Sequence, residues 1–157
     1  MANSYLSSEA LINHFSLISR LFGNLFYRSP SDPILSGVFN WLEQGGLTQV
    51  WPLVVDGQSE QALQVLQNVP NLTELEQEYQ QLFQINTGAV PNSLSAYDID
   101  AAAFSQFRIM RAMPEVESAD HFGLVLLTTS WIEDNLDSLE AQRECFETFY
   151  YFVQGVF

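Results

Sequence analysis

Apolar residues recur at intervals of three and four along most of this 157-residue chain, and this spacing constrains the fold more than any other feature. The longest example runs from about Ser7 to Arg28, where one helical face would collect Leu11, Phe15, Ile18, Phe22 and Leu25. No segment shows the strict alternation typical of strands, and no repeat or linker interrupts the chain. The sequence therefore predicts an all-α helical bundle that forms a single domain over residues 1–157.

Start and stop signals divide the rest of the chain into further helices. Asp32 followed by Pro33 predicts the start of a second helix, which the Gly45-Gly46 pair ends. Other helices are predicted over residues 58–66, from a Thr73–Glu76 capping box to Phe83, from Asp98 or Asp100 to Met110, from Ser118 to Ile132, and from Ser138 onward with Cys145, Phe146, Phe149, Phe152 and Val153 inward. Gly23, inside the first helix, predicts a close approach by a neighbouring helix.

The composition bounds the class of protein. Hydrophobic residues make up 47% of the chain and aromatic residues 13%, enough for a substantial core. No apolar run approaches the ~20 residues that span a bilayer, and the N-terminus lacks the features of an export signal. A single cysteine, Cys145, excludes an internal disulfide and a multi-cysteine metal site. We therefore expect a cytoplasmic protein without a membrane span.

The charge is strongly one-sided. Nineteen acidic residues face five basic ones, and the formal net charge is -14. Such a surface repels phosphate backbones and anionic lipids, which disfavours nucleic-acid and membrane binding. It favours a basic partner, although solubility alone explains the same charge equally well.

Signals for catalysis or for a bound cofactor are weak. The chain has no glycine-rich phosphate loop and no H-E-x-x-H motif, and it has two histidines. Asp98 and Asp100 form a tempting carboxylate pair, but helix capping explains them more simply. Cys145 falls on an apolar helical face, where a thiol is most often inert packing. We expect neither a metal nor a cofactor.

Asp120-His121 is the polar pair of most interest. It is predicted to open a helix, where free backbone N–H groups and the helix dipole stabilise a carboxylate. One interpretation is structural, with Asp120 as a cap and His121 filling a half-buried polar gap. A small acid-base hydrolase using this pair is a distant alternative, because no nucleophile or cofactor motif accompanies it.

Two short motifs, Tyr79-Gln80-Gln81-Leu82-Phe83 and Asp120-His121-Phe122-Gly123, together with the loop Val90–Tyr97, resemble the signature of a known family. This is the TorD/DmsD/NarJ family of cytoplasmic chaperones, which mature bacterial molybdoenzymes. The resemblance extends to Ile18–Pro30 and to Trp51-Pro52-Leu53. It implies a TorD-like helical bundle and a non-enzymatic chaperone.

The resemblance also implies a binding site. In that family the matching Asp-His pair lies beside the Y/W-x-x-L-F element and is implicated in binding the leader peptide of the client enzyme. Carried across, this resemblance places Tyr79, Leu82, Phe83, Asp120 and His121 around one pocket for a twin-arginine leader. Carboxylates suit the guanidinium groups of such a leader, and an apolar groove suits the stretch that follows them. A plain core stripe is the alternative for the three residues on the helix; Leu82 is expected in the core either way, and Tyr79 nearer the surface.

Two departures from the family pattern affect these expectations. The loop that carries Pro91, Ser95 and Tyr97, expected to be a hinge or a rim, has Pro91-Asn92 where the family has two prolines. From the resemblance we also expect residues 1–157 to lack the last C-terminal element usual in the family. The C-terminal helix would then end in Phe149, Phe152 and Phe157 without an evident covering element, so a homodimer is expected as an alternative to a monomer. The expected partner is a client enzyme or its leader; the alternative client is a cytosolic metalloenzyme without a leader.

Overall fold

Helices provide the regular structure throughout the described part of the chain. The computed structural model describes the backbone of residues 8–153 and the side chains of residues 14–153. In chain order the elements are α1 (Ser8–Tyr27), α2 (Pro33–Glu43), α3 (Gly46–Val50), α4 (Gly57–Gln67), α5 (Leu72–Phe83), the 3₁₀ helix η1 (Leu94–Tyr97), α6 (Ala101–Met110), α7 (Gly123–Asn135) and α8 (Leu139–Val153). Residues 8–153 contain no strand, so the all-α prediction is confirmed. The side chain of Leu11 and all of Phe157 lie outside the described residues.

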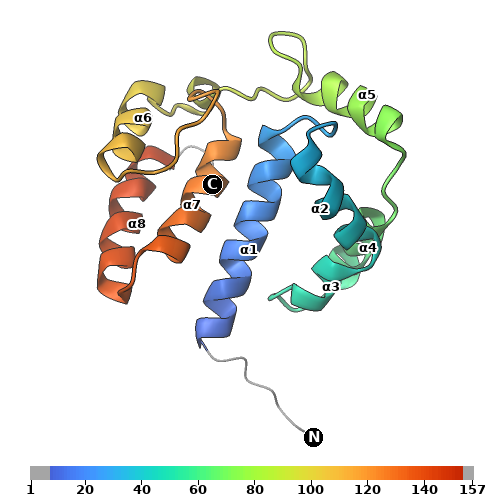
Figure 1. The fold of residues 1–157 in the computed structure, drawn as a ribbon, viewed down its shortest axis with the longest axis horizontal. Coiled ribbons are helices and arrows are strands. Elements are labelled where there is room, and N and C mark those ends of the chain that lie inside the picture. The colour runs from blue at the N-terminus through green and yellow to red at the C-terminus, as the bar shows by residue number, and fades with distance from the viewer. Residues whose placement is uncertain (1–7, 154–157) are drawn as a thin grey trace, which may run out of the picture.

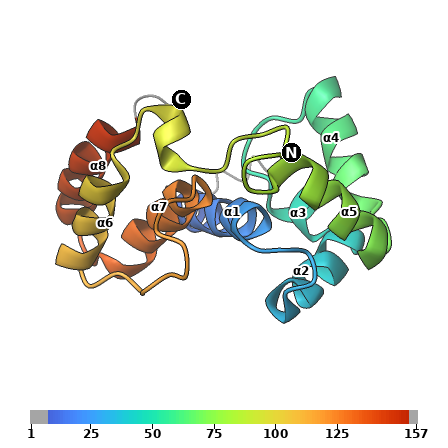
Figure 2. The ribbon, with the colours of Figure 1, turned by 90° about the horizontal axis from the view of Figure 1, so that it is seen from above.

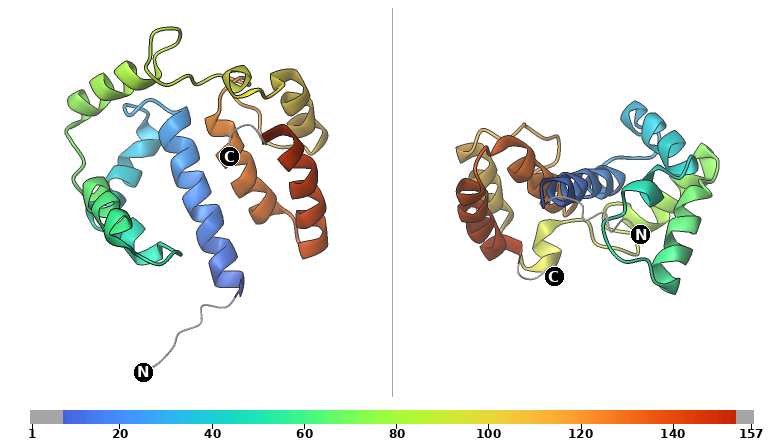
Figure 3. Two further views of the ribbon diagram at one scale, coloured as in Figure 1. Left: turned by 180° about the vertical axis from the view of Figure 1, so that it is seen from behind. Right: turned by 90° about the horizontal axis from the view of Figure 1, so that it is seen from below.

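Helix α1 runs through the middle of the bundle, with α2–α5 on one side of it and α6–α8 on the other (Figures 1 and 2). Each side has its own apolar core. The smaller core is built on Leu21, Leu42, Leu47 and Leu63. The larger one contains Leu94, Ile99, Phe104, Phe107, Met113, Leu124, Val125, Ile132, Cys145, Phe149 and Val153. The views from behind and from below show the same placement of α1 between the two groups of helices (Figure 3).

The two faces of α1 differ in chemistry. Its apolar face packs against the smaller core through Ile18, Phe22 and Leu25, as the spacing predicts, whereas Phe15 of the same predicted face is 49% exposed. Its other face meets α7 through small residues, and there Ser16 and Ser19 are buried. A Cβ added to Gly23 would lie 2.8 Å from the Leu127 side chain and 3.0 Å from the Leu127 backbone nitrogen. The close approach predicted from Gly23 is therefore confirmed.

Side-chain caps fix most of the helix starts. The carboxylates of Asp32, Asp56 and Asp100 accept hydrogen bonds from the first turns of α2, α4 and α6. The predicted Thr73–Glu76 capping box is wrong, because Asn71 caps α5 by accepting from Glu74 N. Glu76 instead turns away from the helix and accepts from Ser29 and Ser31.

The start of α7 also differs from the prediction. Ser118 does not cap it, and α7 begins five residues later at Gly123, since residues 111–122 have no helical structure. This irregular segment is held to the bundle by the buried Arg108, whose guanidinium donates to the Thr128 hydroxyl and to Pro114 O at 3.1 Å. Asp120 and His121 consequently precede the helix and do not lie in its first turn.

Helix α5 is peripheral: none of its residues is buried, and it lies across the end of the bundle (Figure 1). Among the described residues, no helix is both long and apolar enough to cross a membrane.

Candidate functional site

Three chain segments meet at a cleft of about 750 Å³ beside α5. They are the end of α1 with the loop after it, the end of α5 with residues 84–93, and the irregular segment before α7. Five of the predicted site residues line this cleft: Tyr79, Phe83, Pro91, Asp120 and His121. We refer to it as the Asp120 cleft.

The loop after α5 forms one wall of the cleft because it folds back on the end of the helix. Asn86 adopts the left-handed conformation with φ 67°, and a Cβ on Gly88 would lie 2.5 Å from Leu82 O. This tight reversal lets Ala89 N and Val90 N donate to Gln81 O and Leu82 O, at 3.0 and 2.7 Å. The last carbonyls of α5 are thereby satisfied, and residues 91–93 are carried toward the segment before α7.

Asp120 closes the cleft by joining these two segments. Its Oδ1 accepts from the backbone N–H of Leu94, the first residue of η1, at 2.7 Å. Beside it, Phe122 N donates to Asn92 O at 2.8 Å. Asp120 is therefore a cap, but of η1 and not of its own helix. The residue stays exposed, so the carboxylate is open to a partner from solvent.

His121 is buried on the inner wall of the cleft, with 7% of its surface exposed. Its Nδ1 accepts from Gly123 N at 3.0 Å, so the neutral ring carries its proton on Nε2. The ring stacks on Phe122 at 5.3 Å between centroids and meets the edge of Tyr27 at 5.1 Å. Burial lowers the pKa of His121, against an opposing effect of Asp120, so the imidazole is neutral at pH 7. Asp120 and His121 thus hydrogen-bond to separate backbone groups.

Phe83 lines the cleft, and further aromatic rings pack behind it. Phe26, Phe83 and Phe122 meet with centroid distances between 5.1 and 6.2 Å. Tyr79 packs on Phe83 at 5.2 Å and donates its hydroxyl to Phe26 O at 2.9 Å. Burial, assisted by Glu76, raises the pKa of Tyr79, which keeps the phenol protonated. Tyr27, which lines the cleft, and Phe26 and Phe122, which pack behind it, were not predicted as site residues; the only sequence signal for them was their position inside the matched motifs.

The remaining predicted residues lie elsewhere. Leu82 is 42% exposed and is absent from the cleft lining, so the expectation that it lies in the core is wrong. It points outward because the end of α5 packs on the bundle through Tyr79 and Phe83. Tyr97 donates to Pro91 O at 2.7 Å and Ser95 donates to Ser93, so both brace the loop from outside the cleft. Their role as a hinge or rim stays a prediction.

A metal ion would need several histidine, cysteine, aspartate or glutamate side chains close together among the described residues. There, no cluster of three or more histidine, cysteine, aspartate or glutamate side chains is arranged for a metal ion. Cys145 is buried in the larger core.

The fold and the cleft define a class, that of small all-α proteins with an open cleft of aromatic rings, amides and a carboxylate. No family model matches the chain. The chain is 61% identical over 142 residues to an uncharacterized protein of Haemophilus influenzae. The matched residues make up 90% of this chain and 77% of that protein. The chain is 36% identical over 143 residues to chaperone protein YcdY of Escherichia coli, covering 88% of this chain and 74% of YcdY. The chain belongs to the family of chaperone protein YcdY.

Proposed function

We propose that this protein is a cytoplasmic chaperone that binds a segment of a client redox enzyme in the Asp120 cleft and assists its maturation. Membership of the family of a named chaperone supports the chaperone role. The site is proposed because one cleft is lined by residues of both motifs, namely Tyr79, Phe83, Asp120 and His121. These residues belong to two motifs far apart in the chain.

The proposed client segment is a twin-arginine leader of a molybdoenzyme. The exposed Asp120 carboxylate would accept from a guanidinium group, and charge-assisted bonds of this kind are roughly twice as strong as neutral ones. The Tyr79 and Phe83 rings, which line the cleft, would cover the apolar residues that follow the arginines. His121, with its proton on Nε2, would donate to a peptide carbonyl. Each of these groups is already held by packing or by a backbone hydrogen bond, which reduces the entropy lost on binding.

The test measures binding of a synthetic peptide with two adjacent arginines and a following apolar stretch. Asp120→Asn can still accept from Leu94 N, so folding should be preserved, but the anionic charge is lost. We expect affinity to fall by about tenfold, the range of a charged hydrogen bond. His121→Ala should weaken binding by more than its thermal melt accounts for.

The matched control is Asp137→Asn, which removes one charge from an exposed residue outside the cleft. It should bind as the wild type does. Equal affinities of the wild type and a well-folded Asp120→Asn variant would remove Asp120 from the site. If the wild-type protein does not bind this peptide but does bind a metalloenzyme without a leader, the alternative client is the correct one.

A further inference from the structure

A second hollow adjoins the Asp120 cleft along α5. It measures about 520 Å³ and lies between α5 and the loop that follows α1. Its lining includes Ser31, Leu72 and Thr73 together with Glu76, Gln77 and Gln81. Gln80 lines both this hollow and the Asp120 cleft, so the two surfaces are continuous. We call the second hollow the Glu76 groove.

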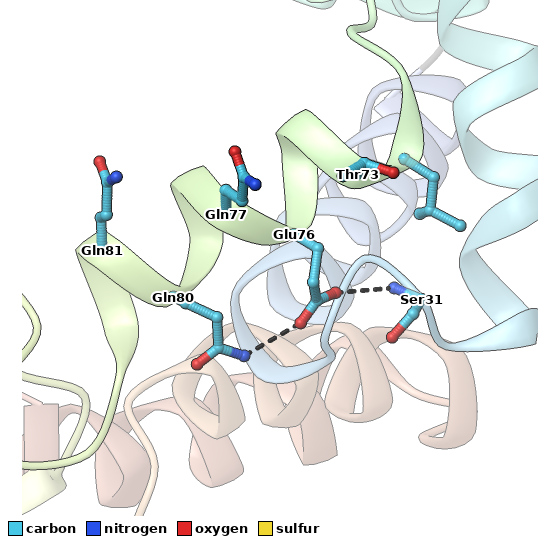
Figure 4. A pocket seen from close by; sticks show the side chains of 7 residues that line it. Ser31, Thr73, Glu76, Gln77, Gln80 and Gln81 are labelled. Carbon is cyan, nitrogen blue, oxygen red and sulfur yellow. Dashed lines mark hydrogen bonds between the residues drawn. The ribbon is translucent and has the colours of Figure 1, made fainter.

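Glu76 lines the Glu76 groove and is hydrogen-bonded to Gln80, the residue that the two surfaces share. Its Oε2 accepts from the Ser29 hydroxyl at 2.7 Å and from Ser31 N at 3.3 Å, and its Oε1 accepts from Gln80 at 2.9 Å. Figure 4 shows Glu76 and Gln80 directed toward the Ser31 loop. The hydrogen bond from Ser29, followed by that from Gln80, lowers the pKa of Glu76, so this carboxyl is ionised at neutral pH. A carboxylate has about four acceptor positions, so these three bonds leave room for a further donor.

Exposed glutamine amides continue the groove on the adjoining face of α5. Gln77 and Gln81 are both exposed and stand on the same side of the helix, away from Ser31 (Figure 4). A glutamine amide offers one acceptor and two donor hydrogens, which matches the alternating C=O and N–H groups of an extended peptide. The groove therefore combines one fixed anion with groups that suit a polypeptide backbone.

The surrounding chain restricts the charge of the occupant. Residues 29–107 contain no lysine, arginine or histidine, whereas they include Asp32, Glu43, Asp56, Glu60, Glu74, Glu76, Glu78, Asp98 and Asp100. Both the Asp120 cleft and the Glu76 groove are built largely from this stretch. A basic segment is attracted to such a surface, and an acidic one is repelled.

We propose that the client segment extends beyond the Asp120 cleft into the Glu76 groove, where Glu76 binds a further cation of the client and Gln77 and Gln81 hydrogen-bond its backbone. This inference rests on the proposed function, which it deepens by adding a second contact site for the same client. The recognised partner is an extended basic peptide with one more cation than the arginine pair. Seven residues of helix separate Glu76 from Phe83, or about 10 Å at the helical rise, which an extended chain covers in about three residues.

The experiment compares two kinds of synthetic peptide on the full chain. The core peptide carries the arginine pair and the apolar stretch. Two extended peptides each add about four residues that include one lysine, the first peptide at its N-terminus and the second at its C-terminus. About four residues are enough to cover the distance from Phe83 to Glu76. We expect at least one extended peptide to bind the wild type about three- to fivefold more tightly than the core peptide, the range of a partly exposed ion pair. Glu76→Gln should abolish this advantage, so that the core and extended peptides bind this variant equally.

Two further variants keep the test independent of folding. Glu76 also anchors α5, but the ratio of extended to core affinity within one variant cancels any loss of folded protein. The double variant Gln77→Ala, Gln81→Ala removes only exposed side chains. It should lower the ratio of extended-peptide to core-peptide affinity by about twofold. Glu78→Gln removes an exposed charge of α5 outside the groove and should keep the full advantage.

The outcomes separate the two proposals. If the core peptide binds and the advantage survives Glu76→Gln, or is lost equally in Glu78→Gln, the Glu76 groove is not a specific site and the proposed function stands. If the core peptide does not bind at all, the proposed function fails, and the extension to Glu76 fails with it.

Discussion

Asp120 and His121 show at the scale of single residues that a structural role and a binding role can share one side chain. Asp120 accepts from Leu94 N and His121 accepts from Gly123 N, yet both line the cleft. The sequence suggested two competing interpretations, a helix cap or a binding pair. The structure gives each residue a backbone hydrogen bond and leaves the Asp120 carboxylate accessible, so capping does not exclude binding.

Glu133 on α7 provides a prediction about pH. Burial, assisted by Asp134, raises its pKa from the usual 4.5 to about 7, and its buried Oε2 has no hydrogen-bond partner. A raised folded-state pKa contributes stability that is complete below pH 4.5 and is lost as the pH rises through about 7. Glu133→Gln is neutral throughout, so its melting temperature should fall less than that of the wild type between pH 5 and pH 8.5. Partial exposure keeps the difference below about 1 kcal/mol.

The control for Glu133 is Glu144→Gln, the same charge change at an exposed position of α8. Thermal melts across the pH range should give this control the wild-type slope. An identical slope for the Glu133→Gln variant would mean that Glu133 is ionised in the folded protein throughout.

Ala112 carries a second prediction at this scale. It follows the end of α6 with φ 53°, a left-handed conformation that glycine adopts without steric cost. Ala112→Gly should therefore raise the free energy of unfolding by about 0.5–1 kcal/mol. Ala102→Gly, at an exposed position inside α6, should lower it by about 1 kcal/mol. Denaturant titration of both variants checks the two opposite signs; a loss of stability in both would contradict this account.

At the scale of elements, α1 organises the molecule because both of its faces are occupied. The apolar spacing of Ile18, Phe22 and Leu25 made one face predictable. The other face consists of small residues, whose burial against α7 leaves no apolar periodicity to detect. Ser16 there bonds Asp134 at 2.6 Å and Ser130 at 3.0 Å. Gly23 was the one residue in the sequence that indicated the packing of this face against another helix.

Gly23→Ala tests this helix contact. Alanine favours a helix by about 1 kcal/mol, but here its Cβ would press on Leu127, including the backbone nitrogen, so we expect a net loss of about 1–2 kcal/mol. Gly37→Ala in α2 is the matched control, because a Cβ there meets nothing within 4 Å and should stabilise the protein. Adding Leu127→Ala should recover part of the loss in a double-mutant cycle. Equal gains for Gly23→Ala and Gly37→Ala would contradict the close contact.

At the scale of the whole molecule, the net charge of -14 controls both stability and association. Two ion pairs are formed by the described residues, Arg20 with Asp134 and Arg28 with Asp32. Most acidic groups therefore repel one another without compensation.

Salt should act in opposite directions on folding and on binding. Raising the salt concentration from about 0.02 M to about 0.5 M screens the repulsion and should raise the melting temperature by roughly 2–4 °C, equivalent to about 1 kcal/mol. The same change should weaken binding of the arginine-pair peptide, since the attraction between opposite charges is screened as well. Melts and titrations at the two concentrations check both signs. A peptide affinity that does not change with salt would leave only the apolar part of the cleft as its binding surface.

Local patterns in the sequence determined the charge of this protein and most of its helices, although not the start of α7 or the short helix α3. Caps such as Asp32 and Asp100 and the spacing of apolar residues were sufficient, because these features act within one or two helical turns. Only the tertiary structure decided that Asp120 bonds Leu94, that Leu82 faces solvent, and that α7 begins at Gly123. These outcomes depend on how segments far apart in the chain pack against α1, and no local spacing encodes that geometry.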